Sequence, residues 1–84
     1  GPRLVPAEPP QIAKKIDGLY NIAWKDEKGR NLLMFWAEKG AELELPGVTR
    51  AVLHDPLTGR ETALGNGSWV KVKTKPSLQI LTWD

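Results

Sequence analysis

Short stretches in which apolar and polar residues alternate constrain the fold of this chain more than any other feature. In LYNIAWK (residues 19–25) Tyr20, Ile22 and Trp24 share one phase, and in SWVKVKT (residues 68–74) valines alternate with lysines. A period of two is that of a half-buried strand, and no segment sustains a helical period. Glycine or proline turns, such as GNG, separate the segments. The predicted strands are residues 19–25, 31–37, 41–45, 49–55, 61–64, 68–74 and 77–83.

Short strands that recur about every 8–12 residues are typical of a sandwich or a small barrel. We therefore expect an all-β fold, a small antiparallel β-sandwich of about seven strands that is Ig-like or jelly-roll-like, with a small β-barrel as the alternative. Residues 31–37 (NLLMFWA) are apolar in both phases, which predicts a central strand covered from both sides. In residues 41–45 and 68–74 the leucines and valines should point inward, and the glutamates and lysines outward.

The N-terminal part of the chain differs from the rest in composition. Gly1 and Pro2 match the scar that protease removal of an expression tag leaves. The stretch RLVPAEPPQ (residues 3–11) is too rich in proline for a helix or a central strand. We expect residues 1–16 to be a tag remnant and proline-rich linker, and residues 17–84 to be the β-sandwich domain.

Composition sets several classes of function aside. The absence of cysteine excludes a disulfide framework and thiolate metal sites, and we see neither a metal-ligand motif nor a phosphate-binding glycine loop. We therefore predict no metal site and no cofactor. No apolar run is long enough to span a membrane. Twelve basic and ten acidic residues, with a net charge of +2, form a mixed surface that disfavours nucleic acid as the partner.

The stretch VLHDPLTGRETAL (residues 52–64) places the only histidine of the chain beside an aspartate. Turn chemistry explains it, because Asp55 can accept a bond from an N–H two or three residues on and Gly59 can adopt a positive φ. His54 and Asp55 are neighbours in a strand and should point to opposite faces, so they cannot form a dyad. With no nucleophile to activate, the sequence predicts no catalytic residue, and the chain is not expected to be an enzyme by itself.

Three segments together resemble a known module: Leu-x-Phe-Trp within residues 33–37, Asp-Pro-x-Thr-Gly at residues 55–59, and a last strand introduced by Pro76. Over about residues 19–84 the chain resembles the small C-terminal β-sandwich attached to many glycoside hydrolases of the (β/α)8-barrel clan. This resemblance implies a non-catalytic accessory module that packs on, or is tethered to, a catalytic barrel. The catalytic carboxylates of that family belong to the barrel, so none is carried over to this chain.

The four tryptophans are candidate sugar platforms, because a flat indole can stack on the C–H face of a pyranose. The phases of Trp24 and Trp36 favour the core for both. Trp69 has the phase of the lysines, and if the last two strands paired, Trp69 and Trp83 would form one aromatic patch for a sugar or a docked domain. The candidate carbohydrate-binding residues are Trp69, Trp83, Trp24 and Gln79.

The sequence leaves three functions open. The first is a structural accessory module, whose partner is the catalytic glycoside hydrolase domain of the same parent chain. The second is a carbohydrate-binding module that contacts polysaccharide through a tryptophan platform. The third is a small barrel that binds single-stranded nucleic acid through Trp69 and Lys71, Lys73 and Lys75, although Glu42 and Glu44 could lie opposite these lysines. A membrane is not expected as a partner, and secretion is favoured if the parent degrades polysaccharide.

Overall fold

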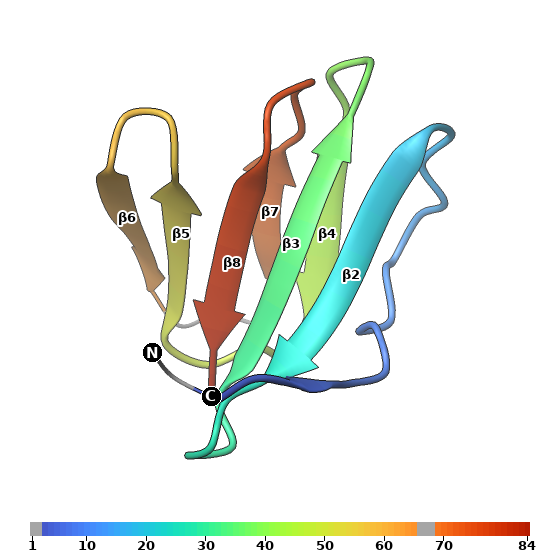
Figure 1. Cartoon of the computed structure of the whole chain (residues 1–84). Helices are drawn as coiled ribbons and strands as arrows, with labels where there is room; N and C mark the ends of the chain where they lie inside the picture. Colours follow the sequence, from blue (N-terminus) through green and yellow to red (C-terminus); the bar gives the residue numbers. More distant parts are fainter. Residues whose placement is uncertain (1–2, 66–68) are drawn as a thin grey trace.

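The computed structural model describes residues 3–65 and 69–84, which contain eight strands and no helix. The strands are β1 (Val5–Pro6), β2 (Leu19–Lys25), β3 (Asn31–Ala37), β4 (Glu42–Pro46), β5 (Ala51–Asp55), β6 (Arg60–Gly65), β7 (Trp69–Lys73) and β8 (Gln79–Trp83). They form a six-stranded sheet in the order β1-β2-β3-β8-β5-β6 and a two-stranded sheet β4-β7. Figure 1 shows the two-stranded sheet behind the larger one. The described residues form no helix that could cross a membrane.

The prediction of an antiparallel sandwich is confirmed, because the two sheets do not close into a barrel. The strands lie within a few residues of their predicted positions, and the additional strand is β1. Residues 66–68, which include most of the expected GNG turn, lie outside the described residues.

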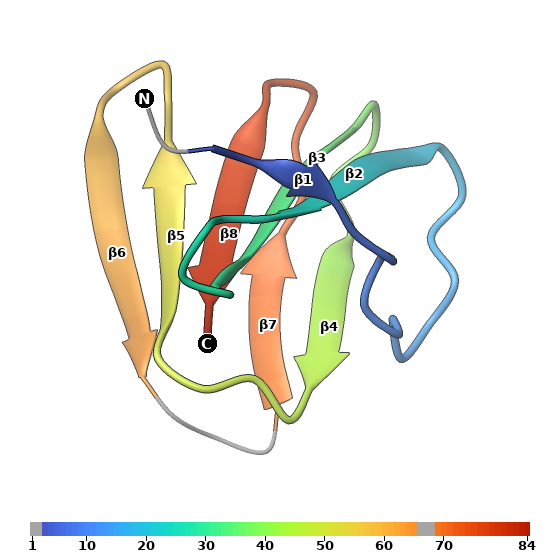
Figure 2. The same cartoon turned by 60° about the horizontal axis from the view of Figure 1, so that its bottom comes forward.

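The N-terminal segment that was expected as a linker lies along the sandwich (Figure 2). Strand β1 pairs with the outer edge of β2, where a proline is tolerated because no further strand needs its missing N–H. The Ala7 N–H donates to the carbonyl of Ala23 at 3.0 Å, and the Ala13 N–H donates to that of Glu44 at 3.1 Å. Ile12 and Ile16 pack against the core. This segment therefore contacts both sheets.

The core lies between the two sheets. Leu33, Phe35 and Leu81 from the large sheet are 0% exposed. The two-stranded sheet buries Leu43 and Leu45 against them, together with its valines. Its glutamates and lysines point outward, as predicted, with Glu42 opposite Lys73 and Glu44 opposite Lys71. Two short strands thus cover only the middle of the larger sheet (Figure 1).

Thr74 fixes the corner at which the chain changes sheets. Strands β3 and β4 belong to different sheets, as do β7 and β8, so both connections cross the sandwich. The Thr74 hydroxyl, in a side chain only 1% exposed, accepts from the N–H of Ala41 at 2.9 Å and lies 3.2 Å from the carbonyl of Lys39. The Thr74 N–H donates to the carbonyl of Ala41 at 2.8 Å, and the Ala37 N–H donates to that of Lys75 at 3.0 Å. These bonds hold the two crossing connections together.

Strand β3 lies centrally in its sheet, between β2 and β8, but it is covered on one side only. Leu33, Phe35 and Ala37 are buried, whereas the alternate residues Leu32, Met34 and Trp36 are partly exposed. The prediction that this strand would be covered from both sides is therefore wrong for the described part of the chain. The physical reason is that, in the described part of the chain, the second sheet β4-β7 packs on the face of β3 that carries Leu33 and Phe35, and no further sheet covers the opposite face.

Replacing Phe35 by alanine should remove the largest fully buried side chain of the core. We expect the free energy of unfolding to fall by about 3–5 kcal/mol, because the lost apolar transfer energy adds to the cavity left behind. Urea denaturation followed by tryptophan fluorescence measures this. Leu57→Ala is the control: Leu57 is 75% exposed, so the change should stay within about 0.5 kcal/mol. Equal effects of the two substitutions would contradict this description of the core.

Candidate functional site: an apolar sheet face and its cavity

The uncovered side of the six-stranded sheet is apolar across its central strands. Residues directly opposed on neighbouring strands share a face, so the strand registers define three rows. The rows are Trp24, Leu32, Thr82 and Val52; Ile22, Met34, Ile80 and His54; and Tyr20 and Trp36. We call these residues the outer face. All of them are at least partly exposed, in contrast to the core residues on the other side of the same strands.

This apolar character is unusual for an uncovered sheet. An antiparallel sheet with one solvated face normally carries polar residues on that face. Here Tyr20 is 53% exposed and Ile22 is 47% exposed. The rings of Tyr20 and Trp36 stack, with centroids 5.4 Å apart and planes inclined by 13°. The outer face therefore presents preassembled apolar and aromatic surface to its surroundings.

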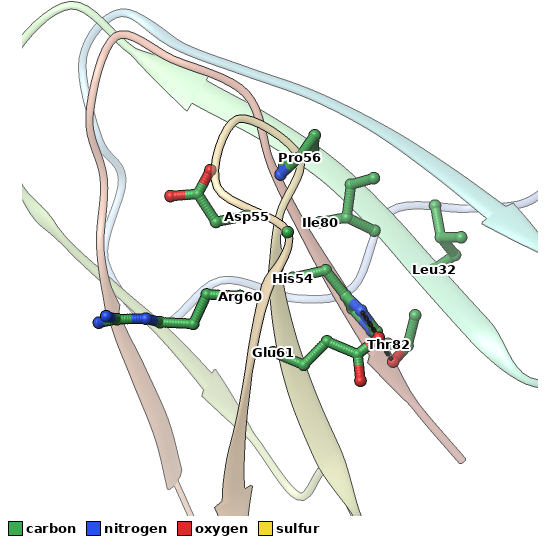
Figure 3. Close-up of a pocket in the computed structure, with 9 residues that line it drawn as sticks. Leu32, His54, Asp55, Pro56, Arg60, Glu61, Ile80 and Thr82 are labelled. Atoms are coloured by element: carbon green, nitrogen blue, oxygen red, sulfur yellow. Dashed lines mark hydrogen bonds and ion pairs between the residues drawn. The ribbon is translucent and has the colours of Figure 1, made fainter.

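A cavity of about 340 Å³ adjoins the outer face at the β5–β6 hairpin (Figure 3). Leu32 and Ile80 come from the two central strands, and Pro56 comes from the turn. The cavity is lined by Leu32, His54, Asp55, Pro56, Gly59, Arg60, Glu61, Ile80 and Thr82. Because Leu32, His54, Ile80 and Thr82 belong to the outer face as well, the cavity continues that face rather than forming a separate site.

Hydrogen-bonding groups hold the His54 ring at this cavity. Its Nε2 atom lies 3.0 Å from Thr82 Oγ1, and its Nδ1 atom lies 3.3 Å from Glu61 Oε1. Strand register explains both contacts: Glu61 is directly opposite His54 on β6, and Ile80, opposite His54 on β8, is two residues from Thr82. Both ring nitrogens therefore have partners, and the orientation of the imidazole is fixed.

The turn after β5 has the chemistry that the sequence predicts. Asp55 Oδ1 accepts a hydrogen bond from the Leu57 N–H at 3.0 Å, and Thr58 Oγ1 accepts one from the Arg60 N–H at 3.2 Å. Gly59 has a φ of +74°. Asp55 does not contact the ring of His54 and instead pairs with Lys75. The turn interpretation is confirmed, and the two side chains act separately.

The ion pair of Asp55 shifts the titration of this carboxylate. Lys75 Nζ donates to Asp55 Oδ2 at 2.6 Å, and the Asp55 side chain is 17% exposed. This hydrogen bond is the largest cause of a pKa of Asp55 that lies below its ordinary value of 3.8. Partial burial opposes the shift, and the Leu57 N–H adds to it. Charged Asp55 thus ties the hairpin to the connection before β8.

The candidate sugar-binding residues do not form one platform. Strand β7 pairs with β4, and β8 pairs with β3 and β5, so the pairing of the last two strands that would have joined Trp69 and Trp83 does not occur. Trp69 is 50% exposed at the end of the two-stranded sheet. Trp83 and Gln79 point into the sandwich and are 8% and 5% exposed. Trp24 lies on the outer face and is partly buried.

Two of these candidates, Trp24 and Trp83, do line a common cavity. It is about 150 Å³ in volume, and Ala7, Glu8 and Pro10 of the N-terminal segment also line it. Its volume is below the range of about 300–1,000 Å³ that ligand sites usually have. Within the described residues, the buried Nε1 of Trp24 has no hydrogen-bond acceptor. This cavity is too small for a pyranose and its neighbours in a polysaccharide chain.

The lysines proposed for nucleic-acid binding are matched by acidic residues. Lys71 and Lys73 lie opposite Glu44 and Glu42 in the two-stranded sheet, as the sequence suggested. Lys75 is engaged with Asp55. A groove that tracks a phosphate backbone needs an excess of positive charge, which these pairings reduce. Across the described residues no group of three or more metal-ligating side chains occurs either.

Sequence reasoning did not single out the Tyr20–Trp36 pair or the cluster of His54, Thr82 and Glu61. A signal for the first was present, because residues 19–25 and 31–37 both carry large apolar side chains in the phase that became the outer face. For the second, the predicted turn could have placed Glu61 opposite His54, but no local signal pairs β5 with β8, which brings in Thr82.

Comparison of the sequence with models of known protein families and with curated proteins gave no match. The interpretation of the site therefore rests on its own geometry. Residues 33–37, residues 55–59 and the last strand are spatial neighbours: β3 pairs with β8, and β8 pairs with β5, which leads into the Asp55–Gly59 turn.

The pairing of Asp55 with Lys75 should make stability depend on pH. A lowered pKa in the folded state contributes stability that is present above the unfolded pKa and is lost as pH falls through the folded pKa. We expect Asp55→Asn to lower the free energy of unfolding at pH 7 and to flatten its fall below about pH 4. Urea denaturation between about pH 2 and 7 measures both curves. Wild-type and variant curves that stay parallel throughout would contradict the assignment, and Lys75→Met should reproduce the flattened curve.

Proposed function

We propose that this chain is a non-catalytic accessory β-sandwich that docks through its outer face on a neighbouring domain of its parent protein. The observation that carries the proposal is that the outer face is largely apolar across the central strands β2, β3 and β8, while the second sheet covers only the opposite face. Exposed apolar patches of this kind mark interaction surfaces. The role of the module is to stabilise the domain on which it packs.

The size of the outer face favours an interdomain contact over a dimer. Four strands about 4.8 Å apart, each contributing about five or six residues at about 3.3 Å, give about 350 Å² in projection. Stable complexes bury about 800 Å² on each partner, more than the outer face offers. Interfaces between domains of one chain bury about 600–1,500 Å² in total, or about 300–750 Å² on each side, and the outer face lies within that range. A covalent tether supplies the effective concentration that lets such a modest interface form.

The resemblance to the C-terminal modules of (β/α)8-barrel glycoside hydrolases suggests which domain this is. Two of the three resembling segments, β3 and β8, form the centre of the outer face, and the third lines the adjoining cavity. The parts of the chain that carry the resemblance are therefore the parts that would meet the docked domain. We propose a catalytic glycoside hydrolase barrel as that domain, with all catalytic carboxylates on the barrel.

A second candidate function, carbohydrate binding, is favoured by the Tyr20–Trp36 stack. Both rings belong to the outer face, and Tyr20 is more than half exposed. An exposed aromatic pair offers ring surface on which a sugar can stack. This platform differs from the one expected at Trp69 and Trp83.

Replacing Ile22 by aspartate should disrupt docking. The substitution places a charge on the apolar face, at the β2 end of the row that Ile22 forms with Met34 and Ile80, and burying an unpaired carboxylate is costly. If the parent protein has the proposed catalytic domain, we expect the affinity of the variant for that domain, expressed separately, to fall at least about tenfold by calorimetry, a loss of about 1.4 kcal/mol. Val5→Asp is the matched control, because Val5 is 49% exposed, close to the 47% of Ile22, but lies on edge strand β1 outside the outer face.

Three outcomes would contradict the docking proposal. The first is equal affinity of the Ile22→Asp variant and the wild type. The second is an upstream reading frame that encodes no glycoside hydrolase domain, which would remove the proposed partner. The third is a stable dimer of the isolated chain in sedimentation that Ile22→Asp dissociates, which would make a second copy the occupant of this face.

Affinity electrophoresis separates docking from carbohydrate binding. In gels that contain β-glucan, xylan, mannan or starch, we expect the isolated chain to migrate as it does without polymer. Retardation by one polymer that Trp36→Ala abolishes would establish the carbohydrate-binding alternative on the outer face. Trp69→Ala is the comparison variant, because Trp69 is exposed on the other sheet.

A further inference from the structure

We infer that the cavity beside His54 is a socket that receives one aromatic side chain of the docked domain and so anchors the interface. The socket is the cavity described above: Leu32, His54, Pro56, Ile80 and Thr82 line it, and Asp55, Gly59, Arg60 and Glu61 of the β5–β6 hairpin complete its lining. This inference rests on the proposed docking function and specifies the chemistry of the partner at one point. It adds a concave feature to a contact surface that is otherwise a sheet face.

The volume of the socket suits one ring system. At about 340 Å³, it lies at the lower end of the range for ligand sites, which is roughly 300–1,000 Å³. An indole or a phenol ring fits such a space, whereas several linked sugar rings require a longer groove. Interface anchors are typically single Trp, Tyr or Arg side chains seated in a pocket of the partner.

The apolar walls of the socket come from two central strands and a turn. Leu32 and Ile80 project from adjacent central strands, and Pro56 closes the side formed by the turn (Figure 3). Leu32 and Ile80 are only partly buried, so a ring placed between them would remove further apolar surface from water. Since the strands are held by backbone pairing on both sides, the socket is formed before the partner arrives.

The charges around the socket are already paired or directed elsewhere. Glu61 faces the Nδ1 atom of His54, and Asp55 is bonded to Lys75. The side chain of Arg60 extends away from His54 (Figure 3). An Arg or Lys anchor would therefore find no unengaged carboxylate of Asp55 or Glu61, and a neutral aromatic anchor is the better match.

His54 supplies a flat surface to such an anchor. Its two ring nitrogens are engaged with Thr82 and Glu61, which fixes the plane of the imidazole and leaves the ring faces for packing. Aromatic rings pack well on one another in offset or edge-to-face arrangements. The socket therefore combines two aliphatic walls with one oriented aromatic ring.

Titration with indole, followed by ¹H–¹⁵N NMR of the labelled chain, tests the socket directly. We expect saturable shifts of the His54, Ile80 and Thr82 amides with a Kd of about 1–10 mM, as is reasonable for so small a ligand. Ile80→Phe fills the socket and should raise that Kd at least about fivefold. Ile80→Ala removes a wall and should do the same, so that misfolding of one variant does not decide the result. Trp69→Ala should leave the Kd unchanged.

Two results of the titration would overturn the inference. One is that indole shifts only the amides of Tyr20 and Trp36, or none. The other is that methyl β-glucoside, titrated in the same way, shifts the socket amides while indole does not, which would make the cavity a sugar site.

Docking measurements with the same variants separate this inference from the proposed function. If the socket is the anchor, Ile80→Phe weakens docking about tenfold, as the loss of a central anchor does. If Ile22→Asp weakens docking but Ile80→Phe does not, the socket inference fails and the docking proposal stands. If neither variant affects docking, the proposed function fails and the socket inference fails with it, even where indole binds.

Discussion

Strand β3 carries apolar side chains on both faces, and a sheet built around such a strand has two surfaces to remove from water. The second sheet removes one of these surfaces from water, because Leu33 and Phe35 pack against the leucines and valines of the two-stranded sheet. The other surface continues across β2 and β8 through directly opposed apolar pairs such as Ile22 and Met34. Exposure of the second surface follows from topology, because a two-stranded sheet can cover one side only. The candidate site is a direct consequence of how this fold distributes its apolar residues.

The buried corner at Thr74 determines where the outer face lies. Because Thr74 bonds the backbone around Ala41, it holds the end of β7 against the connection that leaves β3. The chain then crosses to β8, whose register against β3 places Ile80 opposite Met34. A slip of one residue would turn every side chain of β8 to the opposite face, exposing Leu81 and burying Ile80. The hydroxyl of one threonine therefore supports both the core and the composition of the outer face.

The sequence predicts the strands and their turns well, because alternation and turn chemistry are local. The Asp55 turn and the inward valines of β7 follow from residue order alone. The sequence does not predict how the two sheets assemble, and this assembly determines which tryptophans are buried and which lie on the outer face. Trp83 is buried because its phase of β8 faces the core, and Trp24 and Trp36 lie on the outer face because the other phase of their strands meets the core. Phase assigns residues to a common face, but only tertiary packing determines which face is the inside.

The polar groups of the outer face argue for a protein surface rather than a polysaccharide as its partner. Sugars present many hydroxyls, and a site that binds them needs donors and acceptors beside its aromatic rings. On the outer face His54 and Thr82 already bond one another, and His54 also faces Glu61. The remaining residues there are aliphatic, apart from Met34, Tyr20 and the two indoles of Trp24 and Trp36. Burial against such a surface leaves sugar hydroxyls without partners, which costs free energy, whereas apolar side chains of a docked domain lose nothing on leaving water. The same property that makes the face unfavourable for sugars makes it suitable for packing on another domain.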